Sequence, residues 1–193
     1  MSMIKIHRLK DALIIVDLQN DFCTGGELSV PHGDKIVPII NSIVPYFKRV
    51  FATQDWHPEN HISFKTQGGI WPAHCVADSA GADFHPGLYL NGAIRIKKGS
   101  HPHKEVYSGF DETDLSKKLG RDGIKRIFLA GLATDYCVKA TALDALENGF
   151  KVVVVADAVK GIESNPGDSE AAMREMTRAG AIIARFSNLI PTT

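Results

Sequence analysis

The chain has 193 residues, which favours a single domain over residues 1–193 and is enough to bury a substantial core. Its 22 basic and 22 acidic residues give a formal net charge of zero, so it lacks the positive charge that attracts nucleic acid or anionic membranes. No apolar run approaches the roughly 20 residues of a membrane helix, and the N-terminus, MSMIKIHRLKD, lacks the apolar core of a signal peptide. We therefore expect a cytoplasmic protein with a small-molecule substrate, no nucleic-acid partner and no membrane partner; the sequence allows a homo-oligomer but does not fix the oligomeric state.

Apolar runs rich in β-branched residues alternate with segments of helical spacing. Such runs are typical of strands that are covered on both faces, as in a parallel sheet. The predicted strands are 12–16, 50–53, 93–96, 126–130, 152–156 and 181–186, and the predicted helices lie at about 34–48, 111–121, 135–148 and 168–179. Gly149 and Gly180 each stand where a helix C-cap is expected, directly before a strand. The alternation predicts a three-layer αβα fold around a mostly parallel six-stranded sheet.

The long segment 55–92 shows neither helical nor strand periodicity and is rich in Gly, Pro, His and Trp. An irregular insert of this size within a compact domain is usually functional. We therefore expect it to form a wall of the site.

Polar residues follow four of the predicted strands. Open α/β sheets bind ligands at the carboxyl ends of their strands, where the connecting loops diverge. Asp17, Asp55 and Lys98, with Lys97 beside it, stand at or near such ends, and Cys137 follows a fourth strand. Any one of them could be a turn former or a helix cap, but together they predict a site at this edge.

Cys137 is the candidate nucleophile among three cysteines, an odd number that argues against a disulfide framework. Thr134 or Asp135 could cap the following helix, which would place the sulfur in its first turn, where the helix dipole favours the thiolate. Asp17 could accept the thiol proton, and the Lys98 ammonium could hold this aspartate ionised and favour the thiolate. The backbone N–H groups before Cys137 could receive an oxyanion.

A second group of side chains has the composition of a metal site. Asp55 and His57 are two residues apart, and His74 could return from the irregular segment to complete two imidazoles and a carboxylate. This set suits Zn²⁺, Fe²⁺ or Mn²⁺. His61 is a further candidate ligand, and Ser63 could contact a metal-bound water; spacing does not decide between them.

Three aromatic residues adjoin the same strand ends. Phe22, Trp71 and Tyr107 could form an apolar slot for a flat ring. Each could equally serve only in packing.

These stretches resemble the nicotinamidase/pyrazinamidase branch of the isochorismatase-like cysteine hydrolase family. The resemblance rests on IIVDLQNDFCTGGEL, ATQDWHPENHISF, GGIWPAHCV, IKKGSHPHKEVYSGF and LAGLATDYCVKATALDA, which span most of the chain in family order. It implies that Asp17, Lys98 and Cys137 form the catalytic triad and that Asp55, His57 and His74 bind one divalent metal ion, Zn²⁺ above Fe²⁺ or Mn²⁺. It also implies an oxyanion hole from the N–H groups of Ala133 and Cys137, next to a cis peptide between Leu132 and Ala133.

The activity that the resemblance implies is hydrolysis of nicotinamide, and of pyrazinamide, through a cysteine thioester, in the setting of NAD salvage. Phe22, Trp71 and Tyr107 would pack around the ring. A first alternative is an amidohydrolase of another carbamoyl or ureido compound with the same triad, which a metal site beside the nucleophile disfavours. An isochorismatase needs no cysteine nucleophile, so Cys137 argues against it. A non-catalytic metal- or ligand-binding protein on the same scaffold predicts nothing about the thiol.

Overall fold

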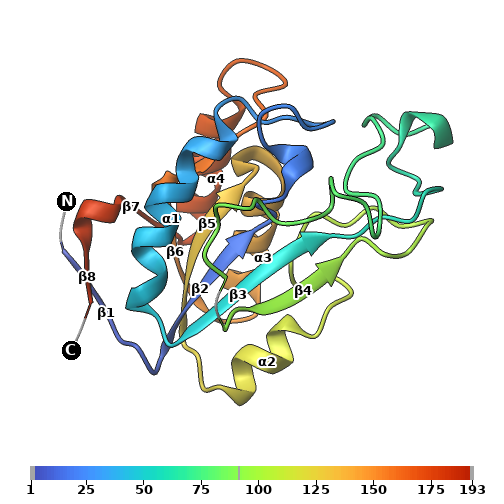
Figure 1. The fold of residues 1–193 in the computed structure, drawn as a ribbon. Helices are drawn as coiled ribbons and strands as arrows, with labels where there is room; N and C mark the ends of the chain where they lie inside the picture. Colours follow the sequence, from blue (N-terminus) through green and yellow to red (C-terminus); the bar gives the residue numbers. More distant parts are fainter. Residues whose placement is uncertain (1–2, 91, 192–193) are drawn as a thin grey trace.

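A six-stranded parallel sheet forms the centre of the computed structural model, which describes residues 3–90 and 92–191 (Figure 1). The strand order is β4-β3-β2-β5-β6-β7, and every neighbouring pair is parallel. The strands are β2 (Asp11–Val16), β3 (Arg49–Asp55), β4 (Ile94–Lys98), β5 (Arg126–Leu132), β6 (Lys151–Lys160) and β7 (Ile182–Ala184). The predicted parallel α/β architecture is confirmed.

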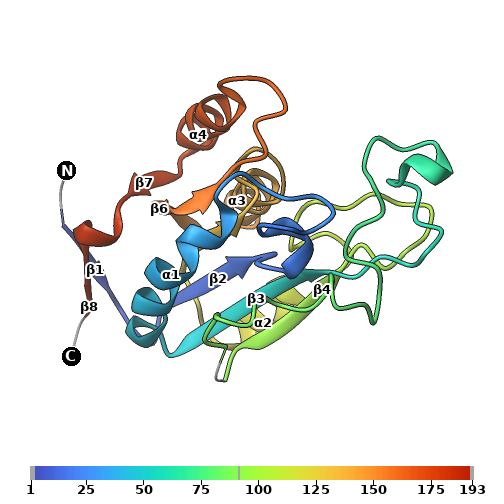
Figure 2. The same cartoon turned by 45° about the horizontal axis from the view of Figure 1, so that its top comes forward.

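Helices cover both faces of the sheet, which makes the three layers. They are α1 (Val37–Ile43), α2 (Leu115–Arg121), α3 (Lys139–Glu147) and α4 (Asp168–Ala179). The side chains of α1 join one hydrophobic cluster and those of α2, α3 and α4 join the other, so α1 lies on the face opposite to α3 (Figure 2). Every residue of β2 is buried, and its side chains alternate between the two clusters because successive strand residues point to opposite faces.

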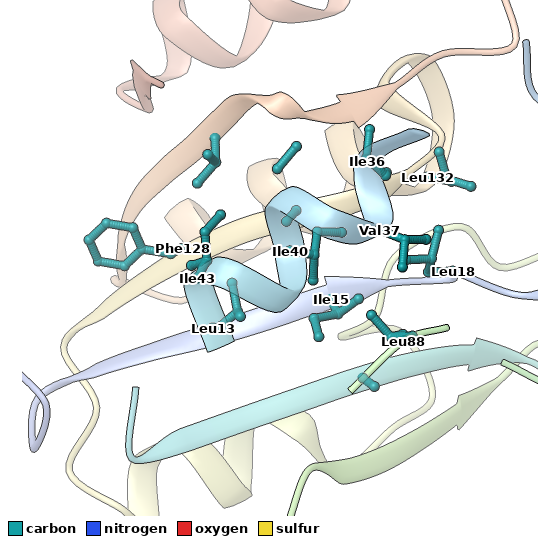
Figure 3. Close-up of a cluster of buried hydrophobic side chains, with 14 of the residues drawn as sticks. Leu13, Ile15, Leu18, Ile36, Val37, Ile40, Ile43, Leu88, Phe128 and Leu132 are labelled. Atoms are coloured by element: carbon teal, nitrogen blue, oxygen red, sulfur yellow. The ribbon is translucent and has the colours of Figure 1, made fainter. Parts of the chain in front are cut away.

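The core beneath α1 shows why this segment is helical. Val37, Ile40 and Ile43 recur at helical spacing and are buried on one side of the helix. They face Leu13 and Ile15 of β2 (Figure 3). Full burial of each such side chain stabilises the fold by roughly 1.5–3 kcal/mol.

Three of the predicted helices are shorter as α-helices in the structure, and of the predicted 135–148 only α3 is α-helical. Of the segment 34–48, only α1 is α-helical, and 3-10 turns flank it on both sides. Pro45 in the second turn has no N–H to continue the α-helical hydrogen bonds. α2 begins at Leu115 rather than at 111, because the Thr113 hydroxyl donates to Gly109 O at 2.6 Å and accepts from Leu115 N at 3.2 Å, which holds a turn before the helix.

The sequence patterns did not predict a small two-stranded sheet that joins the two ends of the chain. β1 (Ile4–Ile6) pairs in parallel with β8 (Leu189–Pro191) (Figure 1). Strands of three residues are too short to show a period, so only their pairing reveals them. Among the described residues, no helix is long and apolar enough to cross a membrane.

The segment 55–92 leaves the sheet after β3 and is mostly irregular, as predicted. Figure 1 shows its teal and green part projecting beyond the carboxyl ends of β3 and β4. One 3-10 turn, Lys65–Gln67, and two isolated bridges, His57 with Val76 and Phe64 with Trp71, give it local order. Its return toward the sheet brings distant residues to the strand ends.

Candidate active site

Strand register places the first polar side chains of the site next to one another. Asp55 is the last residue of β3, Lys98 is the last residue of β4, and the two are paired neighbours across the sheet. Asp17 follows β2 directly and turns the chain with a positive φ of 44°, and Cys137 lies five residues beyond the end of β5. The carboxyl ends of four strands thus meet at one site.

The Lys98 ammonium lies at the centre of this group. Its Nζ is 3.0 Å from Asp17 Oδ2 and 3.5 Å from Cys137 Sγ, and it also donates a hydrogen bond to Asp55 Oδ1. One carboxylate oxygen from each aspartate and the cysteine sulfur all lie within 4.8 Å of one another. All four residues are buried. The structure therefore brings together an aspartate, a lysine and a cysteine, Asp17, Lys98 and Cys137, that are remote in the chain.

Strand alternation separates Lys98 from its neighbour Lys97. Lys98 is 1% exposed and points into the site, whereas the Lys97 ammonium lies over the ring of Trp56, 3.4 Å from its centroid. Neighbouring residues of a strand point to opposite faces, so only one of the two lysines can reach the thiol.

Thr53 orients the Asp17 carboxylate and was not predicted. Its hydroxyl donates to Asp17 Oδ1 at 2.7 Å, and Thr53 also receives the Asp17 backbone N–H. Thr53 lies two residues before Asp55 on β3 and hence on the same face. Period-two spacing from Asp55 is the sequence signal that could have found it.

Burial and charge set the pKa values of the buried group. Burial alone would lower the pKa of Lys98, but Asp17 and Asp55 outweigh it and the pKa is raised well above its usual value, so the ammonium stays charged. Burial likewise opposes ionisation of Asp55, yet Lys98 and the nearby imidazoles lower the pKa of this carboxyl. For Asp17, burial prevails over the attraction of Lys98 and raises the pKa.

The surroundings of Cys137 do not favour the thiolate form that the sequence led us to expect. Burial raises its pKa well above the usual value, and this effect exceeds the opposing one of Lys98. Burial therefore favours the neutral thiol in the free protein, and a base is needed to take its proton when it attacks. Asp17, with its raised pKa, is the adjacent carboxylate suited to that transfer.

The backbone around Cys137 also differs in detail from a simple helix start. Thr134–Val138 forms a π-helical turn before α3, and neither Thr134 nor Asp135 caps it with its side chain. Asp135 instead accepts the backbone N–H groups of Ile162 and Glu163 at 3.0 and 2.8 Å. The prediction of a cap here is wrong because these amides, which come from beyond β6, take both carboxylate oxygens.

The chain enters this turn through a cis peptide between Leu132 and Ala133. The Ala133 carbonyl accepts hydrogen bonds from the N–H groups of Tyr136 and Val138, so it is turned toward the helix. Gly131 before it has φ 121°, and a Cβ there would lie 2.1 Å from the carbonyl oxygen of Val16 on β2. Only glycine fits this approach.

Asp55, His57 and His74 form a group suited to a divalent metal ion. Their ligand atoms lie within 4.8 Å of one another, and all three residues are buried. The Nδ1 of His57 lies 2.8 Å from Gly99 O and that of His74 lies 2.9 Å from Pro72 O. A carbonyl can only accept, so each Nδ1 carries a proton and Nε2 is the nitrogen of each ring that is available to a metal.

His61 is arranged differently, although its ring centroid is 4.1 Å from that of His57. Its Nε2 lies 3.1 Å from Lys104 O, to which it donates, and its Nδ1 accepts from the Ser63 hydroxyl at 2.7 Å. Burial and the neighbouring His57 lower its pKa, so the ring is neutral. Both nitrogens are occupied by protein groups in this arrangement.

One pocket joins the thiol to the candidate metal group. Its space of about 400 Å³ includes the mouth, which opens to solvent. The predicted residues that line it are Phe22, Asp55, His57, Trp71, His74, Tyr107, Ala133 and Cys137. Asp17 and Lys98 are buried beside the sulfur and are not among the lining residues. Ser63, the candidate contact to a metal-bound water, also lines the pocket. The lining residues that prediction missed are Leu28, Glu105, Val106, Tyr136 and Ile162; most come from loops without periodicity, but Tyr136 directly precedes Cys137.

The sheet and the pocket beside the buried Asp-Lys-Cys group define a class of three-layer α/β enzymes that act on small substrates. The Isochorismatase domain model matches residues 11–187, and the chain belongs to this family.

Relatives of known structure or activity fit this assignment. The nicotinamidase of Escherichia coli is 41% identical, over 89% of this chain and 93% of its own. The pyrazinamidase of Pyrococcus horikoshii, solved in complex with zinc, is 51% identical with a TM-score of 0.86, and covers 91% of this chain and 99% of its own. PnC1 of L. infantum, solved with nicotinate, is 38% identical with a TM-score of 0.93, over 97% and 98% of the two chains.

Proposed function

We propose that the protein is a nicotinamidase that hydrolyses nicotinamide to nicotinate and ammonia and also accepts pyrazinamide. The observation that carries the proposal is that Cys137 and the group of Asp55, His57 and His74 line the same pocket. A ring nitrogen at the metal group and a carboxamide at the sulfur would engage both ends of one small molecule. The names of the relatives support this substrate class.

The residues of the chain suffice for a balanced reaction. Asp17 takes the thiol proton as the Cys137 sulfur attacks the carboxamide carbon, and the N–H groups of Ala133 and Cys137 receive the oxyanion. Asp17 then gives the proton to the departing ammonia, which leaves a thioester. Water attacks the thioester with Asp17 as the base, and nicotinate and the free thiol are released. Lys98 stays charged throughout and compensates the negative charge of the buried group.

Asp55, His57 and His74 are the residues that would hold the metal ion, and their free donor atoms fit a borderline cation. We propose Zn²⁺, which suits two imidazoles and a carboxylate. When bound, it supplies a Lewis acid that attracts the pyridine nitrogen and so orients the ring. Phe22, Trp71 and Tyr107 would pack on the ring. We propose that the chain, residues 1–193, forms a single domain.

The proposal is tested by ammonia release from nicotinamide and pyrazinamide, with carbamoyl amino acids as rival substrates. We expect release from both ring amides by the wild type, and loss of it in Cys137→Ala with metal content unchanged. Activity on carbamoyl amino acids alone would replace the substrate assignment. Full activity of Cys137→Ala would remove the thioester route.

A further inference from the structure

Glu105 is a carboxylate in the wall of the pocket that the proposed reaction does not use. Its side chain is exposed and it also lines the pocket. One of its oxygens, Oε1, accepts a hydrogen bond from Trp71 Nε1 at 3.2 Å and another from the Tyr107 hydroxyl. Residues of two loops that are far apart in the chain are thus joined by a single oxygen.

The same hydrogen bonds order an aromatic wall. Trp71 Nε1 also lies 3.2 Å from the Tyr107 oxygen, and Tyr136 contacts both rings, edge-on to Trp71 with centroids 5.0 Å apart and 5.6 Å from Tyr107. Burial, together with the hydrogen bond to Glu105, raises the pKa of Tyr107, so its hydroxyl remains a donor. Glu105 therefore limits the orientations open to two of the three aromatic side chains proposed to hold the ring.

Glu105 also gives the pocket a negative charge. Among the described residues it forms no ion pair, since the adjacent Lys104 ammonium contacts Asp111 at 2.8 Å and Glu112 at 3.3 Å. The other carboxylate that lines the pocket, Asp55, does form an ion pair, with the Lys98 ammonium. An anionic group of a ligand in this pocket would be repelled by the carboxylate of Glu105.

We propose that Glu105 determines specificity: it fixes the aromatic wall through Trp71 and Tyr107 and selects neutral ring amides over amides that carry a carboxylate. The inference rests on the proposed function. The same charge favours release of an anionic product. A unit charge about 8 Å away, at an effective dielectric constant of about 40, changes the affinity for an anion by about fivefold.

The test compares Glu105→Gln, which keeps an acceptor oxygen but loses the charge, with Glu105→Ala, which loses both. The matched control is Glu147→Gln, which removes an exposed carboxylate at the other end of α3 from Cys137. Dissociation constants of nicotinamide and nicotinate are read from quenching of Trp71 fluorescence in a Trp56→Phe background, because the chain has only two tryptophans. Values of kcat and KM are measured on nicotinamide and on 5-carbamoylnicotinate, a ring amide with a carboxylate.

We expect Glu105→Gln to shift the nicotinamide-to-nicotinate affinity ratio by about fivefold toward the anion at low salt, and less at high salt, where the charge is screened. The kcat/KM ratio of the two amides should shift in the same sense. Glu105→Ala should in addition raise the KM for nicotinamide more than it lowers kcat, and Gln should restore most of that loss. Glu147→Gln should change neither ratio.

An unchanged affinity ratio in Glu105→Gln, or an equal shift in Glu147→Gln, would overturn the inference. A wild type that binds both ligands but releases no ammonia would end the proposed function and leave the binding ratio as the test of Glu105. A wild type that binds neither ligand would overturn both.

Discussion

Replacement of Lys98 by Met removes the one cation that the two buried aspartates share. At 3.0 Å and an effective dielectric constant of about 20, the attraction between the Lys98 ammonium and the Asp17 carboxylate is about 5–6 kcal/mol. Desolvation of the ammonium, which is fully buried, offsets part of this gain. Loss of one partner from a buried ion pair costs about 3–5 kcal/mol, because it leaves uncompensated charge inside the protein.

We expect Lys98→Met to lower the free energy of unfolding by about 3–5 kcal/mol at pH 7, or the Tm by roughly 6–20 °C. Without the ammonium, the raised pKa of Asp17 rises further and the lowered pKa of Asp55 moves upward, so both carboxyls become protonated more readily as the pH falls. The destabilisation should therefore be smaller at pH 5 than at pH 7. Urea unfolding and calorimetry at the two pH values measure this, with ammonia release as the activity assay.

A double-mutant cycle isolates the interaction from general effects of the substitution. Asp17→Asn removes one of the two charges, so Lys98→Met should cost less stability in this background than in the wild type. Additive effects, or a Lys98→Met protein within about 1 kcal/mol of the wild type at both pH values, would refute the reasoning that buried charge governs this site.

Three further perturbations test separate parts of the site. His57→Ala should lower bound zinc by at least tenfold, as measured by elemental analysis after dialysis, whereas His61→Ala should retain most of it, since both His61 ring nitrogens are already hydrogen-bonded; equal losses would contradict the ligand assignment. Because burial raises the pKa of Asp17, the acidic limb of the pH profile of kcat/KM should lie above about 3.9, the usual pKa of an aspartate. Activity should be present at higher pH and lost as the pH falls through the raised pKa. An acidic limb at or below about 3.9 would exclude Asp17 as the base. Gly131→Ala should destabilise the protein by about 2–3 kcal/mol in urea unfolding, because a Cβ at this position would lie 2.1 Å from Val16 O. Gly149→Ala should cost only about 1 kcal/mol, because a Cβ there meets no atom within 4 Å. Similar losses of stability for the two variants would show that the contact with β2 is unimportant.

The main elements of the fold were predictable from local patterns. Each buried strand reads as a β-branched apolar run because both of its faces are covered, and the C-cap at Gly180 was visible as a glycine before a strand. Exact ends were not predictable. Lys98 belongs to β4 rather than to the loop after it, since pairing with Asp55 on β3 extends the ladder beyond the apolar residues.

The reactive residue types were also readable from the sequence. An acid, a lysine and a cysteine at the ends of parallel strands predict a shared site because those ends lie at one edge of the sheet, and the motifs indicate the family. By contrast, the charge state of Cys137 depends on how far burial outweighs the Lys98 ammonium, and this balance exists only once the core has closed around both groups.

The sequence by itself thus determined the layers, the order of strands and helices along the chain, and the reactive residues that follow the strands, because hydrophobic periodicity and residue type are read directly along the chain. Only the tertiary structure decided that Thr53 orients Asp17, that His61 is hydrogen-bonded through both nitrogens, and that Glu105 joins Trp71 to Tyr107. The partners in those contacts are chosen by packing in three dimensions, which spacing along the chain does not specify.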